Sequence, residues 1–558
     1  MNLTLGVLVA AGACGLVLRA ARIHRDREIV TQLRHDWGRA RWQDSDLDWT
    51  LQSEAWIESR TDSDRVAGVD AQTWSDLDLD EVVSAVDRTR TGLGRQALYR
   101  RLRSGASWSA STHLETLVGR FGSDARFRER TGACLAAAGR ALGSGFWVIT
   151  RPGLIPRAWW YWCFPILSLA MGVSIVVIPL DPRAVLPALV LAVVNIFVRV
   201  ATSWRLPGVL TPMRQLNPLI GTANCLSRSL RDAGLEAPSI DEDLARLRSL
   251  RRVARWVSRD PTTSGELIAS GWEYLNIVFL LDANALLFTS RRMEELASVL
   301  ERVATWVGEV DVAFSVASLR AEPESWCIPE PSVGPSTRIR GVWHPLVESP
   351  VPNDADLEPG TGIVISGANM SGKSTYLRTI GVAAVLAHGV HTSPATSWDG
   401  PTYRVRSLMG RSDDLLAGKS YYQVEVDGIV ALLREAEGEQ PTLFLLDEIL
   451  RGTNTTERLA TGEAVLRAFL EGRSGRTPHI VAVATHDGEL VARLSDLYTP
   501  WHFRETVEPG GLHFDFMRRA GPATTRTAIA LLEASGAPAG VVDAARERAR
   551  QIDETSHR

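Results

Sequence analysis

The chain has 558 residues, of which 45% are hydrophobic and 23% charged, with a formal net charge of −4. Its length allows about three or four domains of ordinary size. Its slightly acidic balance excludes a protein that is basic throughout, so any contact with DNA would need a local basic face. The cysteines show neither metal-ligand nor redox spacing, and we expect them to be reduced and mostly buried, as in a cytosolic protein; they are Cys14, Cys134, Cys163, Cys225 and Cys327.

The chain begins with an apolar run, Leu3 to Leu18, and basic residues follow it closely. The run is shorter than the ~20 residues that usually cross a bilayer. Because its positive charges come after it, the run does not resemble a cleaved signal peptide. We therefore predict an uncleaved membrane anchor over residues 1–20, with the arginines in the cytoplasm. A buried or interfacial helix is the alternative.

Residues 21–150 are charged and mostly helical in pattern, and we predict that they form the first part of a helical core. Between Val69 and Arg103, acidic residues precede apolar positions at three- and four-residue spacing, which is typical of amphipathic helices. Basic side chains gather at the end of this stretch: Arg95, Arg100, Arg101 and Arg103. They would either contact a phosphate backbone or form a solvated helix face.

The strongest membrane signal lies within residues 151–205. Two long apolar runs, Trp159 to Leu180 and Ala184 to Ala201, are separated by only Asp181, Pro182 and Arg183. Each run is long enough to cross a bilayer, so the pattern predicts a transmembrane helical hairpin with both flanks in the cytoplasm. With the first segment, this makes three predicted spans and places the protein at the cytoplasmic membrane. A hairpin buried in a soluble core is the alternative.

Residues 206–320 return to amphipathic helices and form the predicted second part of the core, which the hairpin interrupts. A Pro- and Gly-rich connector over residues 321–350 leads into the last predicted domain, residues 351–558. One helix of the second part carries a basic face that would contact DNA phosphates, bind anionic lipid headgroups or remain solvated; it contains Arg246, Arg248, Arg251, Arg252 and Arg255.

The last domain opens with a phosphate-binding motif. Ile363 to Ser366 has the pattern of a short buried strand, and the following residues match G-x-x-x-x-G-K-[ST] ahead of a helix, the setting that this motif needs. Backbone N–H groups and the helix N-terminus would bind phosphate. Lys373 would reach the β- and γ-phosphates of ATP, and Ser374 would hold Mg²⁺. The predicted nucleotide-binding residues are Gly367, Ala368, Asn369, Met370, Ser371, Gly372, Lys373, Ser374 and Thr375.

Two later strands end in residues that suit hydrolysis. The apolar strand Thr442 to Glu448 ends in two acids, of which Asp447 would bind Mg²⁺ and Glu448 would polarise the attacking water. Another apolar strand ends at His486, where the imidazole would sense the γ-phosphate. Ahead of both strands in the sequence, Ser412 to Val426 contains Gly-Lys-Ser followed by an amphipathic helix, a second anion-seeking helix start. It would lie over the nucleotide of a partner subunit.

These motifs, in this order, resemble the MutS family of mismatch-repair ATPases, specifically over about residues 320–550 and weakly over 70–320. The resemblance rests on Gly367–Thr375, Ser412–Val426, Asp447–Thr455 and Ala484–His486. It implies an α/β P-loop NTPase domain of the ABC/MutS type after an all-α core. It also implies an ATPase that uses Mg²⁺, with Glu448, His486 and Lys373 as catalytic residues. Ser420 and Glu425 would complete the partner's site in a homodimer.

Two departures from the family pattern bear on function. The first ~70 residues hold the predicted anchor and a charged segment, so we expect the family's N-terminal mismatch-reading domain to be absent. Pro350 stands about where the family places an aromatic residue beside the adenine. The first hypothesis is a membrane-tethered, ATP-switched dimer that acts on DNA. The alternative is an ATP-driven membrane machine that moves a protein or lipid partner without DNA.

Overall fold

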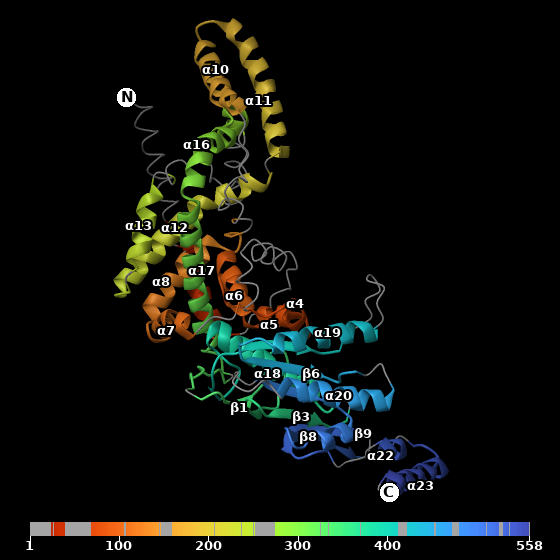
Figure 1. Cartoon of the computed structure of the whole chain (residues 1–558). Helices are drawn as coiled ribbons and strands as arrows, with labels where there is room; N and C mark the ends of the chain where they lie inside the picture. Colours follow the sequence, from red (N-terminus) through yellow and green to blue (C-terminus); the bar gives the residue numbers. More distant parts are fainter. Residues whose placement is uncertain are drawn as a thin grey trace.

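A computed structural model shows an elongated molecule, with an apolar helical hairpin at one end and β-sheets at the other (Figure 1). It describes residues 20, 24–25, 27–39, 68–104, 108–143, 146, 159–205, 207–235, 237–248, 250, 274–323, 325–332, 334–368, 370–410, 421–450, 454–470, 479–508, 511–523, 528–534 and 536–556. The predicted anchor, Leu3 to Leu18, and the segment Ser412 to Ser420 lie outside these residues.

The helical core is built around one buried helix, α17 (Ala297–Leu319), which packs against α6 (Gly92–Ser104) and α7 (Trp108–Ser123). The buried Asp311 carboxylate of α17 accepts hydrogen bonds from the amides of Arg90 and Thr91, just ahead of α6. A carboxylate is favourable there because amides at a helix start lack backbone partners. The other core helices are α4 (Ala71–Asp76), α5 (Leu79–Val86), α8 (Ala125–Ala138), α12 (Pro207–Asp232) and α13 (Pro238–Arg246).

The basic end of α6 serves packing and is not an open phosphate-binding face. Arg100 and Arg101 both pair with Glu309 of α17, and the Arg101 Nε–Glu309 Oε2 distance is 2.6 Å. Arg95 is buried beside Asp87 at 3.3 Å, and the Arg103 guanidinium lies 4.8 Å from the Trp74 ring centre. The two predicted roles, phosphate contact or solvated face, therefore do not describe these arginines.

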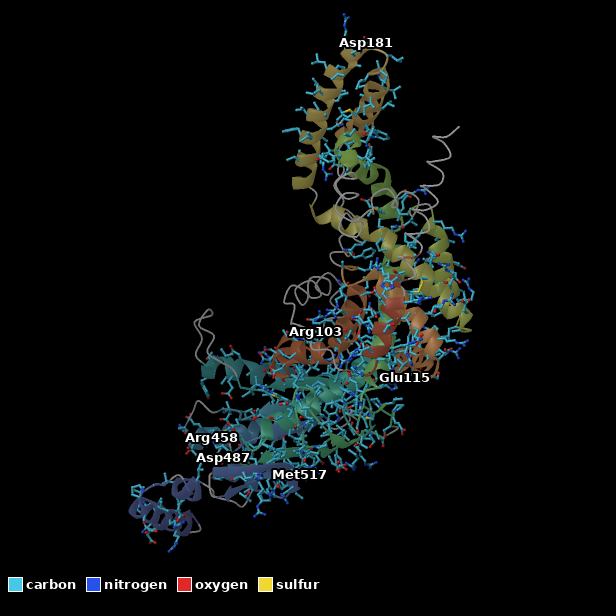
Figure 2. All side chains as sticks on the ribbon, turned by 180° about the vertical axis from the view of Figure 1, so that it is seen from behind. Arg103, Glu115, Asp181, Arg458, Asp487 and Met517 are labelled. Atoms are coloured by element: carbon cyan, nitrogen blue, oxygen red, sulfur yellow. A yellow bond between two sulfur atoms is a disulfide. The ribbon has the colours of Figure 1, made fainter. Side chains whose placement is uncertain are left out.

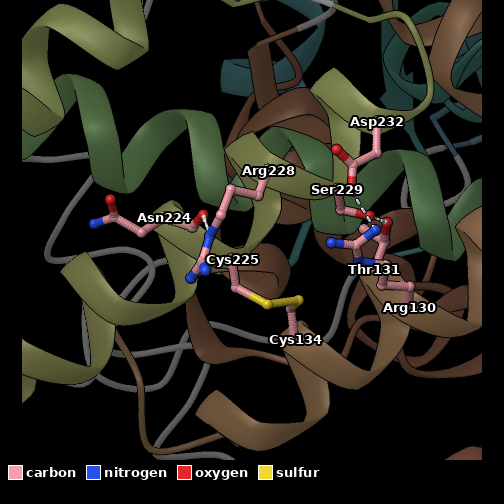
Figure 3. The surroundings of a disulfide bond; sticks show 8 residues. All are labelled: Arg130, Thr131, Cys134, Asn224, Cys225, Arg228, Ser229 and Asp232. Atoms are coloured by element: carbon pink, nitrogen blue, oxygen red, sulfur yellow. Dashed lines mark hydrogen bonds and ion pairs between the residues drawn. A yellow bond between two sulfur atoms is a disulfide. The ribbon is translucent and has the colours of Figure 1, made fainter.

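A disulfide joins α8 to α12, between Cys134 and Cys225 (Figure 3). The Thr131 and Ser229 hydroxyls hydrogen-bond beside it at 2.8 Å. The expectation that these two cysteines are reduced was therefore wrong. They are 91 residues apart in the sequence, and only the packing of α8 on α12 brings them together. Among the described residues, Cys163 and Cys327 are free thiols.

The apolar hairpin consists of α10 (Cys163–Val177) and α11 (Val185–Arg205), with short 3₁₀ turns at Trp159–Trp162 and Pro182–Ala184. In the described part of the chain, only residues 182–201 form a helix long and apolar enough to cross a membrane, and little of it is buried. The structure therefore does not support three spans or a fully transmembrane hairpin. The 22-residue first run yields a helix of only 15 residues, because the tryptophans form a 3₁₀ turn and a turn follows Val177.

A third helix, α16 (Leu281–Glu295), connects the hairpin to α17 (Figure 1). The helical turn before it breaks at Leu280, which has a left-handed φ of +47°. Polar side chains of both hairpin arms donate to carbonyls at this break: Ser168 Oγ to Phe279 at 2.7 Å, and Asn195 Nδ2 to Val278 at 2.7 Å. Because carbonyls at a helix break lack helical partners, these bonds hold the hairpin on α16.

The C-terminal part contains two sheets. The small sheet has the order β2 (Asn353–Leu357), β1 (Thr337–Val342) and β4 (Ser397–Asp399). The six-stranded sheet has the order β5 (Arg404–Leu408), β6 (Thr442–Asp447), β7 (Ile480–Ala484), β3 (Gly362–Ser366), β8 (Tyr498–Glu508) and β9 (Gly511–Ala520). Its strands are parallel except for β9. The buried strands β3, β6 and β7 form its centre, so their carboxyl ends meet at one edge.

Helices alternate with the strands of the large sheet along the chain, which gives this part the predicted α/β class. They are α18 (Lys373–Val390), α19 (Tyr421–Ala436), α20 (Thr455–Leu470), α21 (Gly488–Arg493), α22 (Ala528–Ala534) and α23 (Ala539–Ser556). The buried helix α18 follows β3 directly and also packs on α6. The same helix therefore carries the predicted phosphate loop and contacts the helical core.

Candidate nucleotide-binding site

The predicted phosphate loop turns from β3 into α18. Gly367 has a φ of +141°, and a Cβ there would lie 2.8 Å from the Phe503 carbonyl oxygen, so this position requires glycine. Gly372, with a φ of +104°, precedes the helix, and Lys373 is its first residue. The buried Lys373 Nζ donates to the Gly367 and Ala368 carbonyls, both at 2.8 Å. The loop thus brings an ammonium group and a helix N-terminus together. Asn369 lies outside the described residues.

The two acids and the histidine meet at the same sheet edge, because β6 and β7 are paired in parallel with Asp447 beside Ala484. Glu448 has a left-handed φ of +49°, and its amide donates to the Ala484 carbonyl at 2.9 Å. This turn places Glu448 Oε1 3.4 Å from His486 Nδ1. The structure therefore brings Glu448 and His486 together as the sequence predicts.

Asp447 and Ser374 have the chemistry of a magnesium site. Burial raises the pKa of the Asp447 carboxyl, a hydrogen bond from Ser374 opposes this, and the Glu448 charge adds to the rise. The buried Asp447 Oδ1 has no hydrogen-bond partner. A divalent cation would satisfy this oxygen, and carboxylate and hydroxyl oxygens are ligands that Mg²⁺ accepts alongside phosphate. The described residues contain no group of three or more His, Cys, Asp or Glu side chains that could hold a metal ion.

A cavity of about 340 Å³ extends from the phosphate loop toward β1 and β9. Its lining includes Gly372, Lys373, Ser374, Thr375 and Glu448, which suit phosphate. The lining also includes apolar and aromatic side chains, which suit a flat base; among them are Trp343, Val347, Pro350, Met370, Phe503 and Phe516. This size and polarity match a nucleotide with its phosphates on α18.

Sequence reasoning missed Phe516. It has a left-handed φ of +53°, and a Cβ on Gly372 would lie 3.3 Å from its ring. The ring is therefore next to the phosphate loop and lines the same cavity as Pro350. Nothing in the local sequence signals this, because Phe516 reaches the site only through the antiparallel β8–β9 pairing.

Of the two residues predicted to complete the partner's site, the structure describes only Glu425. Ser420 lies outside the described residues. Glu425, at the start of α19, is buried, and its Oε1 accepts a hydrogen bond of 2.5 Å from the Leu450 amide of the same chain. Leu450 has a left-handed φ of +62° and follows Glu448 by two residues. Glu425 therefore supports the loop that carries Glu448 within its own subunit.

Known proteins match this part of the chain. Residues 363–553 match the family model of MutS domain V. The DNA mismatch repair protein MutS 2 of Halobacterium salinarum is 33% identical over 55% of this chain and 36% of its own length. The DNA mismatch repair proteins MutS of Natronomonas pharaonis and Thermus thermophilus are 35% and 32% identical, each over 46% of this chain and 30% and 31% of their own lengths.

The aligned region thus spans about a third of the length of these relatives. The residues that match the family model, 363–553, contain the phosphate loop, the paired acids and the histidine whose geometry is described above. Residues 363–553 therefore form a MutS domain V, and the chain is a MutS-related protein.

Proposed function

We propose that this protein binds ATP in the cavity above α18 and hydrolyses it with Mg²⁺. The observation that carries the proposal is the 3.4 Å contact between Glu448 and His486 at the sheet edge that also presents Lys373 and Ser374. A general base needs a fixed carboxylate close to the reacting water. Glu448 meets this need because its own amide is bonded to β7.

Each group of the site has its own role in phosphoryl transfer. The loop amides and the Lys373 ammonium bind and orient the phosphates. Ser374 and Asp447 would hold Mg²⁺, which would supply positive charge beside the phosphate oxygens. Glu448 accepts a hydrogen bond from the attacking water and polarises it, while His486 holds Glu448 and contacts the γ-phosphate.

Turnover by the Glu448→Gln variant tests this proposal. The variant should bind ATP normally and hydrolyse it at least about a hundredfold more slowly, because an amide cannot accept a proton. Glu439→Gln is the control, since Glu439 is an exposed acid after α19. Near-normal hydrolysis by Glu448→Gln would remove Glu448 from the role of base.

We further propose that the protein works as a homodimer with composite ATP sites, acts on DNA, and is tethered to the cytoplasmic membrane with the ATPase domain in the cytoplasm. A DNA role is supported by the similarity to proteins named as DNA mismatch repair proteins. Exposed Arg246 and Arg248 on and just after α13 offer phosphate contacts. The long apolar helix 182–201, with its exposed side chains, supports the tether.

A second function has its own support, namely an ATP-driven machine that acts on a lipid or protein partner at the membrane without DNA. The bonds from Ser168 and Asn195 to the break before α16 link the apolar hairpin to α17 and the core. ATPase assays with duplex DNA, mismatched or branched DNA, and liposomes as separate stimulants distinguish the two. Stimulation by DNA that persists after deletion of residues 163–201 supports the DNA function, and stimulation by liposomes alone supports the machine.

A further inference from the structure

An ion pair lies beside the Glu448–His486 contact. Arg458 Nη2 of α20 is 2.9 Å from Asp487 Oδ2, and both side chains are largely buried, 23% and 14% exposed. Figure 2 shows the two residues next to each other on the sheet-bearing half of the molecule. They line one small recess together with Glu448 and His486. A charged pair this close to two proposed catalytic side chains can set their geometry.

Asp487 directly follows His486 and is fixed on several sides. Its Oδ1 caps α21 by accepting from the amides of Glu489 and Leu490 at 3.1 and 3.4 Å. Its own amide donates to Thr485 Oγ1 at 3.0 Å. The Asp487 side chain therefore fixes the backbone that presents the His486 imidazole.

Arg458 belongs to the helix that follows the loop carrying Glu448. It lies one turn into this helix, α20. Asn454 Oδ1 caps this helix by accepting from the Glu457 amide at 2.9 Å. The Arg458–Asp487 pair thus ties the helix after Glu448 to the residue after His486 and closes a ring with the 3.4 Å Glu448–His486 contact.

We infer that Arg458 and Asp487 are a positioning pair that holds His486 against Glu448 for hydrolysis. Neither residue lines the 340 Å³ cavity, so the pair acts on turnover and not on ATP affinity. The inference rests on the proposed ATPase function. A misplacement of about 1 Å in a catalytic group is enough to slow a reaction about a hundredfold.

The chain offers a matched control on the same two helical segments. Arg467, nine residues further along α20, pairs with Asp496 just after α21 at 2.8 Å. This second clamp lies roughly 13 Å along the helix from Arg458. Arg467→Gln therefore removes an ion pair between the same segments without touching the His486 loop.

The experiment measures kcat, KM for ATP and unfolding midpoints in the full-length protein. Arg458→Gln and Asp487→Asn should lower kcat about ten- to a hundredfold with KM within about twofold. Asn retains a cap for α21, so Asp487→Asn isolates the ion pair. Arg458→Lys should recover part of kcat. Arg467→Gln should leave kcat unchanged.

A double mutant with His486 distinguishes a positioning role of Arg458 from general destabilisation of the fold. In a His486→Ala background, Arg458→Gln should lower kcat less than twofold, because the group that it positions is gone. Equal losses of kcat in Arg458→Gln and Arg467→Gln, or full additivity with His486→Ala, would overturn the inference. If Glu448→Gln hydrolyses ATP at the wild-type rate, the proposed function fails instead, whatever Arg458→Gln does.

Discussion

Asn353 holds Phe516 at the nucleotide cavity. Its Nδ2 donates to the Phe516 carbonyl at 3.0 Å, and its Oδ1 accepts from the Arg518 amide at 2.7 Å. Phe516 has a left-handed φ, and these two hydrogen bonds hold the backbone on either side of it. They keep the Phe516 ring beside Gly372. An aromatic residue on β9 thus stands by the cavity that Pro350 also lines.

Phe516→Ala should weaken ATP binding about tenfold, because stacking of a base on an aromatic ring contributes about 1–3 kcal/mol. The loss should appear in Kd or KM, with little change in kcat once the site is saturated. Met517→Ala is the control, since Met517 (labelled in Figure 2) is exposed and follows Phe516 in the sequence but does not line the cavity. Unchanged affinity in Phe516→Ala would exclude Phe516 from base binding.

The site residues that could be predicted from the sequence are those that belong to short local motifs. Asp447 ends a buried strand, and Lys373, Glu448 and His486 follow buried strands, so the parallel pairing of these strands brings the motifs to one edge of the sheet. Phe516 and the disulfide depend on packing between distant segments, and no local pattern encodes that. The family resemblance assigned Glu425 to the partner's site, yet its carboxylate accepts a hydrogen bond from the Leu450 amide within the chain.

Mixing of inactive subunits should show whether Ser420 and Glu425 act across the dimer interface or within their own subunit. If Ser420 completes the partner's site, Ser420→Ala mixed with Lys373→Ala should regain activity, since one intact composite site forms in each mixed dimer. Glu425→Ala mixed with Lys373→Ala should regain none, because Glu425 holds the Leu450 amide in its own subunit. ATP hydrolysis in confirmed mixed dimers is the measurement. Recovery in both mixtures would show that Glu425 also acts across the interface.

Glu115 should contribute a pH-dependent part of the stability. Burial alone would raise the pKa of this carboxyl, but hydrogen bonds from Arg320 and His391 lower it to about 2. Arg320 contacts both Glu115 oxygens, at 2.9 and 2.6 Å, and ties α7 to the end of α17. Because the folded pKa lies below its ordinary value of 4.5, the carboxylate stabilises the fold above about pH 4.5 and loses this effect as the pH falls toward 2.

Glu115→Gln should therefore lower the free energy of unfolding by about 1–3 kcal/mol at pH 7, the range for a charge-assisted hydrogen bond. The difference from the wild type should shrink steadily below pH 4.5. Denaturant unfolding at a series of pH values checks this, and Glu81→Gln, at an exposed acid of α5, is the control. A difference that stays constant between pH 7 and pH 3 would contradict the assigned pKa.

The exposed apolar face of α11 should decide whether the protein binds bilayers. Leu186 and Phe197 are 74% and 73% exposed, and neither contributes to the buried core. Aspartate at such positions costs about 2.5–3.5 kcal/mol in a bilayer centre but little in water. Leu186→Asp with Phe197→Asp should therefore reduce flotation with liposomes by at least about tenfold while ATP affinity is retained. Leu532→Asp on α22, at an exposed leucine outside the hairpin, should float like the wild type. Equal flotation of all three proteins would place the tether outside α11.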